Sequence, residues 1–218
     1  MAKPGKTRRP YDSPRRREQA AETRELVVTE AQRLFERDGY AGTSVAAIAS
    51  AAGVALKTVY LIFGSKPGVL RAVWHRVLRG ERDDLPVGEQ DWFHEVMQEG
   101  DPRRRLLRNA HNSRVVKERA GAIMEVIRAA APGDPEIGEL WRRIQTDFHA
   151  NQRAIIESLT ADGALAADLA TDTGADMLWA LNHPTLYHLL TSERGWTPDQ
   201  YEQWLGELLA LRLLKHPE

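Results

Sequence analysis

The stretch from Thr43 to Phe63 reads TSVAAIASAAGVALKTVYLIF and predicts two short helices joined by a tight turn. Its first half carries apolar residues at the i, i+3, i+4, i+7 spacing of a buried helical face, namely Val45, Ile48, Ala49 and Ala52. Gly53 follows, where a sharp turn needs a residue that tolerates positive φ. A second helix is expected from about Ala55 to Ile62. The stretch therefore predicts a helix-turn-helix, although a helical hairpin of an ordinary helical domain remains the alternative.

The wider segment from Thr23 to Val73 resembles the N-terminal domain of the tetracycline-repressor-type (TetR/AcrR) transcription regulators. The matching residues are Thr23, Ala31, Leu34-Phe35, Gly39-Tyr40, Thr43-Ser44, Ile48-Ala49, Ala52-Gly53-Val54, Thr58-Val59-Tyr60, Phe63, Ser65-Lys66 and Leu70. The resemblance implies a three-helix DNA-binding head, a homodimer and a helical, ligand-responsive body. It also implies double-stranded DNA and a small-molecule effector as partners.

Composition excludes several classes of site. The 218 residues contain no cysteine, so disulfides, thiolate zinc sites and cysteine nucleophiles are ruled out. No metal site or cofactor is expected. No apolar run reaches membrane-spanning length and the arginine-rich start lacks the apolar region of a signal peptide, so a cytoplasmic protein without a membrane partner is expected.

Charge is distributed unevenly along the chain. Residues 1–82 hold 16 Lys and Arg against 8 Asp and Glu, a net charge of +8. Residues 83–218 hold 14 against 23, a net of −9, which gives the overall −1. A basic head on an acidic body favours contact with a polyanion at one end only.

Helical periodicity and caps predict an all-α fold with three parts. A disordered basic arm is expected over 1–22, the helix-turn-helix DNA-binding domain with its connecting helix over 23–82, and a larger helical ligand-binding and dimerisation domain over 83–218. After an acidic loop at 83–91, helices are expected at 92–99, 102–131, 134–160, 172–182, 184–192 and 198–214. Three of them begin with a capping side chain followed by proline: Asp101-Pro102, Asp134-Pro135 and Thr197-Pro198.

The resemblance places the DNA contacts on the second helix of the motif. Leu56, Lys57 and Thr58 would face base edges or adjacent phosphates. The DNA backbone would be held by Ser44, Tyr60 and Lys66. Ala46 is also a candidate contact, early in the first motif helix, at a position where the family often has a polar residue. In the arm, Arg15, Arg16 and Arg17 either line a narrow minor groove or belong to a solvated tail.

A ligand pocket is expected among the helices at 102–131, 134–160 and 172–182. The candidate lining residues are Met97, His111, Met124, Ile127, Trp141, Phe148, Met177, Trp179 and His183. Apolar residues at helical spacing also form ordinary cores, so each of them has that second interpretation. Such a lining favours a hydrophobic or aromatic ligand. Leucines of the last helices would form a four-helix bundle between two subunits or an intramolecular core: Leu178, Leu181, Leu205, Leu208, Leu209 and Leu213.

Catalysis is not expected, because the chain has no Gly-rich phosphate loop, nucleophile elbow or carboxylate cluster. The possible pairs at His111 with Glu118 and at His149 with Asp147 lack the i, i+4 spacing of two ligands on one helical face. The resemblance therefore implies a homodimeric repressor that is released from a palindromic operator by a small molecule, which the apolar lining predicts to be hydrophobic or aromatic. An activator of the same fold, or a helical binding protein with a degenerate head, are the alternatives.

Overall fold

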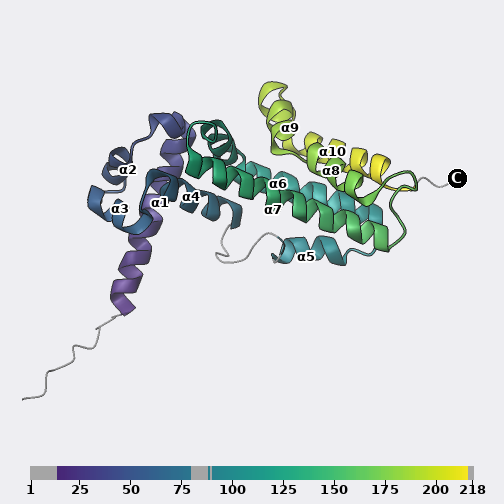
Figure 1. Cartoon of the computed structure of the whole chain (residues 1–218), viewed down its shortest axis with the longest axis horizontal. Helices are drawn as coiled ribbons and strands as arrows, with labels where there is room; N and C mark the ends of the chain where they lie inside the picture. The colour runs from purple at the N-terminus through teal and green to yellow at the C-terminus, as the bar shows by residue number, and fades with distance from the viewer. Residues whose placement is uncertain (1–13, 80–87, 89, 216–218) are drawn as a thin grey trace, which may run out of the picture.

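The computed structural model describes residues 14–79, 88 and 90–215, and Figure 1 shows a small helical head joined to a longer helical body. Throughout these residues the regular elements are helices, and one isolated bridge pairs Leu165 with Leu214. The predicted all-α fold, with a helix-turn-helix domain ahead of a larger helical domain, is confirmed.

The head consists of α1 (Pro14–Gly42), α2 (Val45–Ala51), α3 (Leu56–Phe63) and α4 (Lys66–Arg79). Helix α1 begins at Pro14, nine residues before its predicted start at Thr23, so the prediction of a disordered arm is wrong for residues 14–22. Proline is compatible with a first helical turn, because an N–H at that position would have no intrahelical acceptor. Near the other end of α1, Gly39 takes φ 71° and interrupts the helix at the predicted place. Residues 1–13 lie outside the described part of the chain.

The helix-turn-helix has the predicted local chemistry. The Ser44 hydroxyl accepts a hydrogen bond of 3.0 Å from the Ala47 amide and so caps α2. Gly53 takes φ 66° in the turn, and the axes of α2 and α3 are bent by 111°. No single helix in the described ranges is long and apolar enough to cross a membrane. Helices α2 and α3 would reach that length and apolarity only if they were counted as one span, and they are sharply bent relative to each other.

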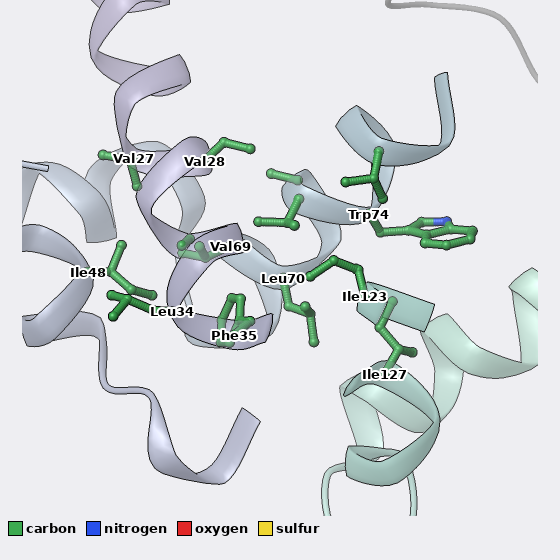
Figure 2. Packing of buried hydrophobic residues seen from close by; sticks show 14 of the residues in the cluster. Val27, Val28, Leu34, Phe35, Ile48, Val69, Leu70, Trp74, Ile123 and Ile127 are labelled. Atoms are coloured by element: carbon green, nitrogen blue, oxygen red, sulfur yellow. The ribbon is translucent and has the colours of Figure 1, made fainter. Parts of the chain in front are cut away.

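One apolar core runs through the head and into the body (Figure 2). Phe35 of α1, Ile48 of α2 and Leu70 of α4 are fully buried in it. Ile123 and Ile127 of α6 (Pro102–Ala130) belong to the same cluster. Because α4 packs against both α1 and α6, a displacement of α4 relative to the body would also move the head.

The body contains α5 (Asp91–Gln98), α6, α7 (Pro135–Ala161), α8 (Thr171–Leu181), α9 (Pro184–His188) and α10 (Pro198–Leu213). The three predicted caps are formed, because Asp101, Asp134 and Thr197 each accept hydrogen bonds from amides of the first turn that follows. The helix predicted at 184–192 is instead α9 followed by a π-helical segment, η2 (Leu189–Glu193).

A second core holds the C-terminal helices together within one chain. Leu178, Leu205, Leu209 and Leu213 are fully buried in it, so for these four leucines the intramolecular alternative holds and a place between subunits is wrong. Two other leucines of the predicted bundle, Leu181 and Leu208, are half-buried.

Candidate DNA-binding face and effector cavity

Helix α3 is anchored by one side and exposed on the other. Val59 is 1% exposed and packs in the head core. On the outer side Leu56, Tyr60 and Leu61 are 43%, 48% and 83% exposed, which is unusual for large apolar side chains of a small domain. Lys57 is exposed beside them and Thr58 is half-buried. Four predicted contact residues, Leu56, Lys57, Thr58 and Tyr60, therefore share this helix, and three of them are exposed.

The remaining predicted DNA contacts differ in their exposure and in the interactions that they already make within the chain. Ser44 and Ala46 are exposed at the start of α2, with the Ser44 hydroxyl already engaged as a cap. Lys66 is half-buried, and its Nζ lies 4.1 Å from the centroid of the Tyr40 ring. Burial lowers the pKa of Lys66, against a smaller opposing effect of Asp134. A phosphate contact by Lys66 would thus compete with its cation–π contact.

The three arginines assigned to the arm stand in the first turn of α1. Arg17 is exposed and takes part in an interaction within the chain, and the backbone of Arg15 and Arg16 is helical. A groove contact by these residues would come from a helix end and not from an extended arm.

A cavity of about 920 Å³ lies between the head's α4 and helices α5, α6 and α7 of the body. Its apolar wall includes Trp74 of α4, Trp92 and Phe93 of α5, and Phe148 of α7. The volume is that of a site for a drug-sized molecule. The prediction placed the pocket against 172–182, but α8 supplies none of the lining residues, whereas α4 and α5 do.

Two of the nine predicted lining residues, Met124 and Phe148, face this cavity. The other seven do not, because the rotation of each helix carries them elsewhere. Ile127 is fully buried in the core shared with the head, and Met97 and Met177 pack against the C-terminal core. His183, Trp141 and Trp179 form an aromatic cluster in which the ring centroids of His183 and Trp179 are 5.3 Å apart. His111 is exposed and bonds Glu202 through Nδ1 at 3.0 Å.

The sequence of the head matches a model of a known protein family. The family model described as "Bacterial regulatory proteins, tetR family" matches residues 27–73, which span the core part of α1, the helix-turn-helix and the first half of α4. Residues 27–73 are thus similar to the N-terminal domain of the TetR family.

Two curated relatives extend the match beyond these residues. The HTH-type transcriptional regulator AcrR of Shigella flexneri is 32% identical over 114 residues, which cover 51% of this chain and 50% of AcrR. The chain therefore spans half the length of that relative. The HTH-type transcriptional regulator TtgR of Pseudomonas putida is 27% identical over 172 residues, 76% of this chain and 79% of TtgR.

The fold of both parts recurs in solved structures. NalD, described as the secondary repressor of the MexAB-OprM multidrug efflux pump in Pseudomonas aeruginosa, superposes with a TM-score of 0.69 at 21% identity. The superposition covers 90% of this chain and 98% of NalD. At this identity the likeness shows a shared fold.

Sequence reasoning missed the polar wall of the cavity. Lys117 and Asn109 of α6 line it and are only 5% and 2% exposed. The Lys117 ammonium donates to Asn182 Oδ1 at 2.5 Å and to the Tyr201 hydroxyl at 2.9 Å. Burial lowers the pKa of Lys117 well below its ordinary value. A signal was present, since Lys117 falls in phase with Ala110 and Ala120 on the buried stripe of α6.

Asn182, which ends α8, joins three helices at this wall. It is fully buried, and its Nδ2 donates to Ser113 of α6 at 2.8 Å and to Gln152 of α7 at 3.2 Å. Its Oδ1 accepts from Lys117, so all its hydrogen-bonding groups point to side chains of the body. A buried amide with satisfied partners fixes one arrangement of the helices around it.

Two contacts tie the head to the body. Tyr40 donates a hydrogen bond of 2.8 Å to Asp134 Oδ2, and Asp134 also caps α7. Burial, followed by this hydrogen bond, raises the pKa of Tyr40. Arg119 of α6 donates to the carbonyls of Val77 and Leu78 at 2.6 Å each. These are carbonyls near the end of α4, which a helix leaves without internal partners.

The histidine pairs considered for catalysis or metal binding have structural partners. His149 Nε2 bonds Asp176 at 2.8 Å and not Asp147, and His111 bonds Glu202 and not Glu118. Within residues 14–79, 88 and 90–215, no group of three or more His, Cys, Asp or Glu residues is placed to hold a metal ion.

Proposed function

We propose that this chain is a homodimeric repressor that binds a palindromic operator through α3 and is released when a small molecule enters the cavity. The exposed face of α3 supports the DNA contact, because Leu56, Lys57 and Tyr60 project from a helix that Val59 anchors. The net charge of +8 in residues 1–82 favours approach to phosphate by this end of the chain. The description of NalD as a repressor supports repression over activation.

The observation that carries the release mechanism is the double role of α4. Its Leu70 and Val73 are fully buried in the head core, while its Trp74 and Leu78 line the cavity. An effector that displaces α4 must therefore also shift α3, which is packed in the same core. Release requires that the effector bind the DNA-incompetent arrangement more tightly than the competent one. The bonds of Arg119 to the end of α4 and of Tyr40 to Asp134 would transmit that shift.

Selection of the purified protein against a random duplex library at near-physiological salt tests this proposal. Sedimentation of the recovered complex then gives its stoichiometry. A palindromic consensus bound by two copies of the chain is expected. Recovery of unrelated duplexes with only salt-labile binding would instead support the binding protein with a degenerate head. A reporter gene placed behind the selected operator distinguishes repression from activation.

Tyr60→Phe and Lys66→Ala are expected to weaken binding to all duplexes about equally, because both side chains are assigned to the DNA backbone. Lys66→Ala is also expected to reduce the slope of log affinity against log salt by about one per subunit. Fluorescence anisotropy over a salt series measures both quantities. An unchanged slope in Lys66→Ala would assign Lys66 to its contact with Tyr40 alone.

A further inference from the structure

The cavity has an unusual electrostatic feature, namely a buried lysine without an acidic partner. Both hydrogen-bond acceptors of Lys117, Asn182 Oδ1 and the Tyr201 hydroxyl, are uncharged. In the described part of the chain no carboxylate forms an ion pair with Lys117. A buried ammonium without a counter-charge is costly, so such a group either gives up its proton or binds an anion. Lys117 is positioned to do the latter because it lines the cavity.

A second observation on the same wall also indicates a missing acceptor. Asn109 lies two turns before Lys117 on α6 and lines the cavity. Its Nδ2 is buried and has no hydrogen-bond partner. Buried polar groups of folded proteins are almost always paired, so an orphaned donor on a cavity wall indicates a ligand acceptor. Ser113, between the two, already receives a hydrogen bond from Asn182 and keeps its own hydroxyl proton to donate.

The acidic residues of the cavity do not supply the counter-charge of Lys117. Glu136, Glu139 and Asp147 lie on the exposed side of α7 and line the cavity together with the basic Arg71 and Arg143. Glu136 pairs with Arg71 at 3.7 Å, and Glu139 forms an ion pair with Arg142. The cavity thus combines an aromatic wall, a mixed-charge rim and a buried donor-rich wall.

We propose that the effector is an apolar or aromatic carboxylic acid whose carboxylate pairs with the Lys117 ammonium inside the cavity. This inference rests on the proposed effector role of the cavity and specifies the chemical class of the effector. The Trp92, Phe93 and Phe148 side chains would cover the apolar body of the ligand. An uncharged analogue would leave Lys117 without its counter-charge and would bind more weakly.

The pairing makes binding depend on pH in a defined direction. In the free protein burial depresses the pKa of Lys117, and a bound carboxylate restores the charged form. Binding therefore takes up a proton wherever free Lys117 is neutral, and affinity falls as pH rises through that range. The titratable groups facing Lys117 are Tyr201 of α10 and His183 before α9, with Tyr187 against Tyr201. The charged or titratable groups at the rim are Arg71, His75, Glu136, Glu139, Arg143 and Asp147.

Calorimetric titration of the purified protein without DNA tests the proposal with three probes that share one apolar body: phenylbutyrate, its primary amide and phenylbutylamine. We expect phenylbutyrate to bind at least about tenfold more tightly than the amide, a factor that corresponds to one charge-assisted contact. The amine should bind most weakly. Titrations of phenylbutyrate in buffers of different ionisation enthalpy should show net proton uptake, and its affinity should decline toward alkaline pH.

Lys117→Met is expected to remove the preference for acid over amide while retaining affinity for the amide. Lys215→Met is the matched control, since it makes the same substitution at an exposed lysine after α10 that does not line the cavity, and it should keep the preference. Equal binding of acid and amide by the unaltered protein, or no binding of any probe at millimolar concentration, would overturn the proposal. The comparison within the unaltered protein is valid even if Lys117→Met does not fold. Because no DNA is present, a negative result leaves operator binding by the head untouched.

Discussion

Lys57→Ala is expected to weaken operator binding by on the order of 10²-fold or more, because each subunit of the proposed dimer would lose one contact to a base or phosphate at about 1–3 kcal/mol. Lys57 stands on the exposed side of α3, next to Leu56 and opposite the buried Val59. Its position leaves the head core intact, so the loss should appear in DNA binding and not in the melting temperature. Anisotropy titration with the selected operator measures the affinity.

The matched control is Lys215→Ala, which removes the same charge from an exposed lysine after α10. It should leave the affinity within about twofold, as screening weakens the effect of distant charges. The Lys57 variant also distinguishes two roles for this side chain. Loss of preference at one operator position would assign Lys57 to a base edge, whereas a uniform loss with a smaller salt slope would assign it to phosphate. An affinity equal to that of Lys215→Ala would remove α3 from the DNA interface.

Gly68→Ala is expected to destabilise the head by roughly 2–3 kcal/mol, the usual cost of forcing an extra group into a packed site. A Cβ at residue 68 would lie 2.0 Å from the Phe63 carbonyl oxygen and 3.1 Å from its carbon. Both are backbone atoms at the end of α3, so relief requires α3 to move away from α4. Thermal and urea unfolding followed by circular dichroism measure the change.

Gly121→Ala supplies the opposite case within the same protein. Gly121 lies inside α6, and a Cβ there meets nothing within 4 Å. Alanine at this position should raise stability by about 0.5–1 kcal/mol through its higher helix propensity. Both glycines are helical, so propensity alone would predict stabilisation at both positions. If Gly68→Ala were as stable as Gly121→Ala, the close approach of α3 and α4 would not constrain the head.

Much of the fold is predictable from local chemistry. Asp101, Asp134 and Thr197 indicated three helix starts because a cap and the following proline act on neighbouring amides. The start of α1 was missed because the stretch after Pro14 is charged, poor in apolar residues and without a periodic apolar stripe. It is helical because it extends, toward the N-terminus, a helix whose later turns pack in the head core. The candidate DNA-binding face was also predictable, since its residues are consecutive on one short helix.

The lining of the cavity was much less predictable. Met124 and Phe148 were identified, but Trp74, Trp92 and Phe93 belong to α4 and α5, which only packing brings against α6 and α7. Ile127 and Met177 have the same apolar character as Met124, and their helix rotation alone places them in cores instead. Sequence periodicity predicts which residues share a helical face, but it does not predict which neighbouring helix packs against that face.

By itself the sequence determined the helical class, the helix-turn-helix, the residues on its exposed face and the concentration of positive charge at that end, because each depends on contacts between near neighbours or on composition. Tertiary structure alone decided that α4 serves both the head core and the cavity. It also decided that Lys117 is enclosed by Asn182 and Tyr201, which are 65 and 84 residues away along the chain. The burial that lowers the pKa of Lys117, and the polarity of the cavity wall, are set by how the helices pack.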